Sequence, residues 1–172
     1  ISWSSYLVVN WVPTLMVYEG YSQAQGIDAL TYFTSGALIG AIALGFLSAR
    51  FLLAPMVAGM LFIAGGLITL WVTIDLTFFA QKMVLAVAGF MFSASYGFWA
   101  IGGAIYSPEV RATGLGWGSG FGRVGAILSP LITGYVVAAG WELDQMMLTL
   151  LVPALLLGAV LVVGVTRQAR QG

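Results

Sequence analysis

Arg123 lies in the middle of a long apolar stretch, and it is the residue of this sequence best suited to bind a ligand. Counting from Arg111, a helix reaches it after about 18 Å, at 1.5 Å per residue. At that depth in a hydrocarbon core of about 30 Å, a guanidinium costs several kcal/mol unless it faces water or a partner. Its planar fork suits a carboxylate. We therefore predict that Arg123 binds an anionic substrate or stabilises a gate. A structural arginine bonded to backbone carbonyls or to a carboxylate of another helix is the alternative.

The helix around Arg123 has two faces built mostly from small residues. At 100° per residue, the face of Arg123 itself leaves room beside the guanidinium, and it comprises Gly116, Ser119, Gly120, Ile127 and Pro130. On a neighbouring face, and in an earlier helix, glycines recur every four residues, a spacing that lets helices approach closely. We predict a helix-packing role for these glycines, which are Gly36, Gly40, Gly114, Gly118 and Gly122.

Polar and aromatic side chains on two other stretches are candidates for the wall of a cavity. Asn10 shares a helix face with Tyr6, and Tyr96 shares one with Trp99. Aromatic faces can stack on a ring or hold an arginine by a cation–π contact. We predict that Asn10, Tyr96 and Trp99 bind the substrate together with Arg123. Contact with lipid or with another helix is the alternative for Trp99.

The composition shows which elements position these residues. Of 172 residues, 60% are hydrophobic and only 7% are charged, against roughly 25% in a soluble domain. So few charges cannot cover a soluble surface, which indicates a membrane protein. The chain has no Cys and no His, so the common metal ligands and the usual general base are missing. We therefore expect no enzyme, no metal and no cofactor, and the net charge of zero without a basic run argues against nucleic acid.

Six apolar stretches are long enough, or nearly so, to cross a bilayer, which takes about 20 residues. They do not alternate as the strands of a membrane barrel would, so we predict an all-α membrane protein. The expected spans are residues 1–18, 29–48, 54–74, 78–105, 112–138 and 146–166.

The six spans form two sets of three. The third span of each set is the most aliphatic and is expected to face lipid, whereas the first and second carry the polar residues that would wall an interior. A 3+3 inverted repeat of inner and outer helices is typical of transporters.

Charges separate into two groups when the spans alternate in direction. Basic residues mark the cytoplasmic side, so both chain termini are expected in the cytoplasm. The basic side holds Arg50, Glu109, Arg111, Arg167 and Arg170. The other side holds Glu19, Asp28, Asp75, Glu142 and Asp144. Lys82 is expected to reach outward from the fourth span. Because the first residue is Ile1 and not Met, we also expect an amino-terminally truncated fragment.

Three segments carry a resemblance to a known family. Residues 11–15 (WVPTL) match the W-x-P-T-L of a seventh helix, and residues 45–50 (GFLSAR) match a G-x-L-x-D-R loop. Residues 111–130 match the R-A-T-G…G-R-x-G-A…P of an eleventh helix. On these segments the chain resembles the carboxy-terminal half, helices seven to twelve, of a major facilitator superfamily transporter. It is most like the aromatic acid/proton symporters. Ala49 stands where the loop motif has an aspartate.

This resemblance implies proton-coupled symport of a small aromatic carboxylate by alternating access in the cell (inner) membrane. The implied partners are the lipid bilayer, the organic anion and protons, and a missing amino-terminal six-helix half that would hold the proton-coupling residues. It also assigns the cytoplasmic gating motif to Gly45, Arg50 and Arg111. Two alternatives remain: a non-transporting scaffold, and a half-size transporter that acts as a parallel dimer.

Overall fold

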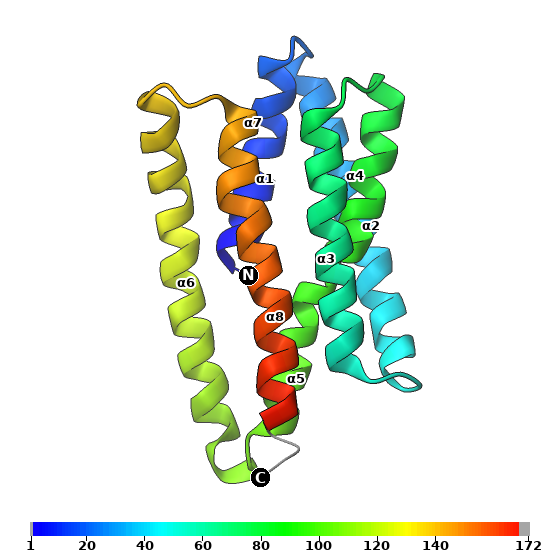
Figure 1. Ribbon diagram of the computed structural model, residues 1–172, viewed down its shortest axis with the longest axis vertical. Helices are drawn as coiled ribbons and strands as arrows, with labels where there is room; N and C mark the ends of the chain where they lie inside the picture. The colour runs from blue at the N-terminus through cyan, green and yellow to red at the C-terminus, as the bar shows by residue number, and fades with distance from the viewer. Residues whose placement is uncertain (1, 169–172) are drawn as a thin grey trace.

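The computed structural model describes residues 2–168 as a bundle of six helical rods that run alternately up and down (Figure 1). The first three rods are single helices, α1 (Ser2–Tyr18), α2 (Gln23–Ser48) and α3 (Leu53–Thr73). The fourth consists of α4 (Phe78–Phe92), a 3₁₀ turn (Ser93–Tyr96) and α5 (Gly97–Ile105). The fifth is α6 (Pro108–Ala138), and the sixth joins α7 (Leu143–Met146), a π turn (Met147–Leu151) and α8 (Val152–Gln168). The described residues contain no strand, which confirms the all-α prediction; Arg170 lies outside them.

Local chain chemistry explains where the helices begin and end. The second helix begins at Gln23 rather than at residue 29, because Ser22 and Gln25 form a reciprocal capping box in a polar segment. Gly20 and Gly140 adopt φ values of 94° and 90°. This left-handed conformation, which favours glycine, ends α1 and α6.

Among the described residues, five rods are long and apolar enough to cross a membrane. The exception is α1, whose 17 residues fall short of the about 20 that a span needs; it begins about halfway along the bundle (Figure 1). Six rods is the number expected for half of a twelve-helix major facilitator fold. Equivalent rods of the two sets of three run in opposite directions, as an inverted repeat requires (Figure 1).

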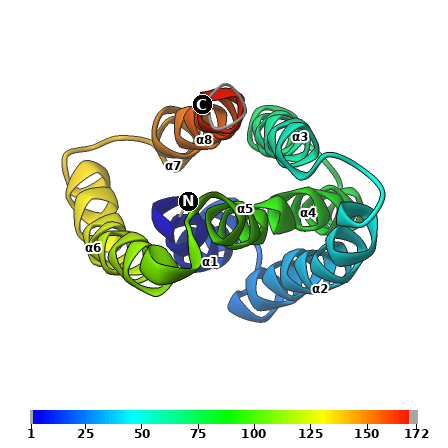
Figure 2. The same ribbon diagram turned by 90° about the horizontal axis from the view of Figure 1, so that it is seen from below.

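The rods pack in layers around the α4–α5 rod. Seen from below, α3 and α8 lie on one side of it and α2 on the other, while α6 stands at the outer edge beside α1 (Figure 2). The core lies between these rods; its largest fully buried side chains include Leu7, Met16, Leu61, Ile68, Leu85, Met146, Met147, Leu151 and Leu155.

The burial of α3, α8 and α6 differs from the expectation that the third helix of each set faces lipid and that the other helices wall an interior. The third helices, α3 and α8, pack on each other along one side and expose apolar residues such as Phe62 and Leu161 on the other. The most exposed helix is instead α6, which was expected to wall an interior and has only Ser129 and Thr133 buried.

The closest helix crossing joins α2 to α4. A Cβ atom added at Gly36 would overlap the carbonyl of Ala86, and one added at Gly89 would overlap the carbonyl of Phe33. A Cβ atom added at Gly40 would also overlap the carbonyl oxygen of Phe90. No larger side chain fits at these three positions without separating the helices.

Apart from Arg123 in the middle of α6, the charged residues of the described chain lie at or near the two ends of the bundle (Figure 1). Arg50, Arg111 and Arg167 lie at one end. At the other end, Lys82 does not reach outward as expected. Its Nζ atom lies 2.9 Å from a carboxylate oxygen of Asp28, and its side chain is only 15% exposed. The physical reason is that α2 brings a carboxylate within reach, which stabilises the ammonium better than an extended side chain would.

Candidate functional site

Arg123 projects from α6 into open space. Its side chain is exposed and forms no ion pair with any carboxylate in residues 2–168. The inner side of α6 faces α1 instead, where a Cβ atom at Gly122 would lie 2.7 Å from the hydroxyl oxygen of Ser2. Because one residue corresponds to 100° around a helix, Arg123 points sideways from that contact. The alternative of a structural arginine paired with a carboxylate therefore has no support within the described chain.

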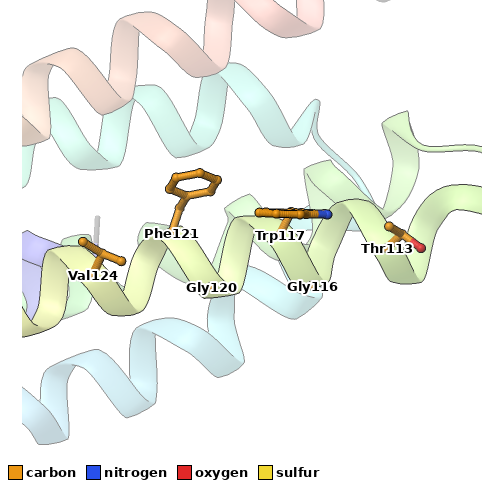
Figure 3. A pocket seen from close by; sticks show the side chains of 6 residues that line it. All are labelled: Thr113, Gly116, Trp117, Gly120, Phe121 and Val124. Atoms are coloured by element: carbon orange, nitrogen blue, oxygen red, sulfur yellow. The ribbon is translucent and has the colours of Figure 1, made fainter.

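A shallow groove runs along the outer side of α6 (Figure 3). Its rings are Trp117 and Phe121, which stack with centroids 5.9 Å apart. Gly120 lies between the two rings and Gly116 lies beside Trp117 on the side of Thr113, each with no atom within 4 Å of a Cβ position. The two glycines thus leave the room expected near Arg123, within about 60° of it around the helix axis. The full lining is Thr113, Gly116, Trp117, Gly120, Phe121 and Val124.

Tyr96 lines a hollow where α1, α2 and α4 meet. Its side chain is exposed. Tyr96 is the last residue of the 3₁₀ turn at which the fourth rod departs from α-helical geometry. A 3₁₀ stretch within a helix often marks a hinge. The hollow is about 410 Å³ and is lined by Ser5, Val9, Phe33, Thr34, Ala37, Leu38, Ala41, Phe92 and Tyr96.

Trp99 lines a different hollow, between α5, α6 and α8. This space is about 570 Å³ and also includes Ser2 at the start of α1. The first turn of α1 separates the two hollows, since Ser5 lines that of Tyr96 and Ser2 lines that of Trp99. Within the described chain, Tyr96 and Trp99 therefore line two neighbouring hollows. No hollow described here includes Asn10 or Arg123.

The three glycines expected to pack α6 all line the Trp99 hollow. A Cβ atom at Gly114 would lie 2.8 Å from the ring of Tyr106, and Gly122 is close to Ser2 as described above. Gly118 faces open space, with nothing within 4 Å. Close approach therefore occurs at the ends of this glycine series and not at its centre.

Asn10 is exposed on α1, where its amide bonds to its own helix. The Nδ2 atom donates to the carbonyl of Tyr6 at 2.7 Å, and the hydroxyl of Thr14 donates to the carbonyl of Asn10 at 3.3 Å. Local bonds of this kind are common for Asn within helices. The amide oxygen is left to accept a further hydrogen bond.

Gly45, Arg50 and Arg111, the residues of the expected gating motif, lie toward the same end of the bundle. Arg111 donates to the carbonyl of Tyr106 from Nε at 3.4 Å and from Nη2 at 3.3 Å. Arg50 lines a surface hollow beside Phe51 and Pro55. The carbonyl of Gly45 accepts a hydrogen bond from Ser48 at 2.8 Å. With Ala49 in place of the aspartate, this loop supplies no carboxylate to bind either arginine.

The sequence analysis did not identify the buried side-chain amide of Gln81, which lies at the end of the bundle opposite Arg50 and Arg111. Gln81 is only 4% exposed, and its Nε2 atom donates to Glu19 Oε2 at 3.1 Å and to the carbonyl of Leu76 at 3.3 Å. Burial raises the pKa of Glu19; the Gln81 hydrogen bond lowers that pKa, and the nearby charge of Asp75 raises it. The only signal in the sequence was a polar residue just inside the fourth apolar stretch.

Among the described residues, no group of three or more His, Cys, Asp or Glu side chains could hold a metal ion. The chemistry that the exposed residues can perform is therefore recognition: charge pairing by Arg123 and ring contact by the aromatic side chains.

Comparison with known proteins shows that the chain is similar to transporters of aromatic acids. A benzoate transport protein of Acinetobacter baylyi is 33% identical over 88% of this chain. A 3-(3-hydroxy-phenyl)propionate transporter of Escherichia coli is 32% identical over 78%. A 4-hydroxybenzoate transporter, PcaK, of Pseudomonas aeruginosa is 30% identical over 97%. The alignments cover 32%, 34% and 38% of these relatives, so the chain spans about a third of their length.

No family model and no solved structure matches the chain. The relatives nevertheless confirm the resemblance to aromatic acid transporters over most of the chain, and they are named as transporters and not as enzymes. Together with the apolar helices, they indicate a multi-pass membrane protein.

Proposed function

We propose that this chain is the carboxy-terminal half of a major facilitator transporter that carries a small aromatic carboxylate across the cell (inner) membrane together with protons. The observation that carries the proposal is Arg123, an exposed guanidinium on an apolar helix without a carboxylate partner in the described chain. The transporter relatives supply the substrate class, because their names specify benzoate, a hydroxybenzoate and a phenylpropionate.

In this proposal a second six-helix half covers the open side of the bundle, and the substrate binds between the halves. Arg123 pairs with the carboxylate through two parallel hydrogen bonds. Tyr96, Trp99 and Asn10 contact the ring and its substituents, with Tyr96 and Trp99 acting from two neighbouring hollows. Rocking of the halves about this site would give alternating access.

The ends of the bundle then have distinct tasks. The loops with Gly45, Arg50 and Arg111 belong to the cytoplasmic gate, and both termini lie in the cytoplasm because basic residues mark that side. Proton coupling is assigned to the other half, since among residues 2–168 the acidic side chains lie at or near the rod ends.

Uptake by the complete protein tests the proposal. Arg123→Gln in proteoliposomes should lower the initial rate of radiolabelled benzoate uptake at least about tenfold, because an anion loses its charge partner. Arg167→Gln is the matched control: it removes an exposed arginine at the end of α8 and should leave uptake within about twofold. Circular dichroism and size-exclusion profiles check that both variants fold.

Three results would overturn this proposal. Wild-type kinetics in Arg123→Gln would remove Arg123 from the site. Equal competition by sugars and by benzoate would reject the substrate class, and uptake insensitive to an imposed pH gradient would reject proton coupling. Intact mass in the native membrane separates the alternatives: a mass near 18.2 kDa would indicate a half-size protein, which must dimerise to transport or else only scaffolds.

A further inference from the structure

A buried amide joins the start of α4 to the turn after α1, at the end of the bundle opposite Arg50 and Arg111. The Nε2 atom of Gln81 donates to Glu19, which directly follows α1, and to the carbonyl of Leu76. Its Oε1 atom is buried and has no hydrogen-bond partner among the described residues. Burying an acceptor without a hydrogen-bond partner is unfavourable, so only the N–H side of this amide is satisfied.

The protonation state of Glu19 decides whether the second half of the amide can be satisfied. An ionised carboxylate only accepts hydrogen bonds, whereas a protonated carboxyl also carries one O–H donor. A neutral Glu19 can therefore accept from Gln81 Nε2 and donate to Gln81 Oε1, which gives a cyclic acid–amide pair. The proton comes from water at this end of the bundle and returns to it on ionisation.

The surroundings of Glu19 favour its neutral form. Partial burial raises the pKa of this carboxyl, the Gln81 hydrogen bond lowers that pKa, and the negative charge of Asp75, in the segment between α3 and α4, raises it. The nearby ammonium of Lys82 is already paired with Asp28 at 2.9 Å. It also lies over the rings of Tyr32 and Phe78. No ion pair between Lys82 and Glu19 occurs in the described chain. Glu142 and Asp144 add further negative charge at this end.

We propose that Glu19 is a proton-binding residue whose neutral carboxyl pairs with the Gln81 amide and holds the turn after α1 against the start of α4, and whose ionised form loosens that contact. The turn between the first two helices is thereby joined to the fourth rod by a bond that responds to pH. The ring contact between Tyr21 and Phe78, with centroids 5.3 Å apart, lies beside it and does not titrate in this way.

Infrared titration of the complete protein in nanodiscs tests whether Glu19 binds a proton. We expect a carboxylic acid C=O band that titrates above the ordinary glutamate pKa of about 4.3. The band should disappear in Glu19→Gln and remain in Glu142→Gln, which changes an exposed acid at the same end. A wild-type spectrum without such a band, or one that Glu19→Gln leaves unchanged, would overturn the proposal.

Distance measurements test whether the proton changes the contact between the helices. Because this chain has no cysteine, spin labels can be attached at Tyr18→Cys and Phe79→Cys, two exposed positions flanking the contact. We expect a narrower distance distribution at low pH than at high pH, and a narrow distribution at every pH in Glu19→Gln, because its amide can also donate. A wild-type distribution that does not change with pH, or pH dependence retained in Glu19→Gln, refutes the mechanism.

A second variant keeps the test decisive if Glu19→Gln does not fold. Gln81→Met keeps the length of the side chain but removes both amide partners, so the distance distribution should lose its dependence on pH. If Gln81→Met responds to pH like the wild type, the amide has no part in the contact. These measurements use no substrate, so their outcome is independent of whether the protein transports aromatic acids.

Discussion

Two regions of the bundle use glycine in opposite ways. At the α2–α4 crossing, Gly36 and Gly89 lie so close to opposing carbonyls that no Cβ atom fits. On α6, Gly116 and Gly118 have no neighbouring atom within 4 Å of a Cβ position, and the adjoining Trp117 is 68% exposed. The same residue type thus creates close contact in one region and open room in the other, and spacing alone does not distinguish the two uses.

The difference also separates a stabilising region from a surface available for binding. A helix that buries only Ser129 and Thr133 contributes little to the core, so its composition must satisfy another requirement. Under the proposed function, leaving space beside Arg123 is such a requirement, because a guanidinium can bind a substrate only where protein side chains do not already fill the volume around it.

The largest expected effect is at the tight crossing. Gly36→Leu should abolish recovery of folded protein, because the side chain would force α2 away from the Ala86 carbonyl, and such overpacking costs several kcal/mol. Gly118→Leu, a matched change in open space, should leave the folded yield near the wild-type value. Fluorescence-detected size-exclusion chromatography of the complete protein in detergent measures both; equal yields would contradict the distinction between the regions.

The sequence predicted the rods well, because the lengths of apolar runs determine membrane helices. It missed the start of α2, since the Ser22 capping box lies in a polar segment that a hydropathy pattern ignores. It also did not show that Tyr96 and Trp99 line different hollows, because neither the 3₁₀ turn nor the first turn of α1 between the hollows is visible in residue spacing.

The Gln81–Glu19 contact could not be predicted from spacing at all. The two residues are 62 positions apart, and only the tertiary fold, which places the turn after α1 against the start of α4, brings them together. Arg123 is the opposite case: its depth and its small neighbours can be counted along one helix, so its placement on an open surface followed from local geometry.

A second, smaller effect compares adjacent residues on α3. Leu61 is 0% exposed and Phe62 is 65% exposed, so Leu61→Ala should lower the free energy of unfolding by about 2–5 kcal/mol, and Phe62→Ala by about 0.5 kcal/mol or less. Reversible unfolding in mixed detergent micelles measures the pair. Equal losses would show that Phe62 is covered in the complete protein and that α3 has two packed faces.

The smallest expected loss of stability is in the α6 groove. Its measurement best distinguishes the open glycines of α6 from the close-packed glycines of the α2–α4 crossing. Trp117 stacks on Phe121 but is otherwise exposed, so Trp117→Ala should cost at most about 1 kcal/mol of unfolding free energy. Reversible unfolding in mixed detergent micelles measures this loss, with Phe62→Ala as the reference for an exposed aromatic side chain. A loss of about 3 kcal/mol or more, which is typical of a buried aromatic side chain, would show that another part of the complete protein covers this groove. In that case the glycines beside Trp117 serve close packing, as Gly36 does, and the room beside Arg123 is not open.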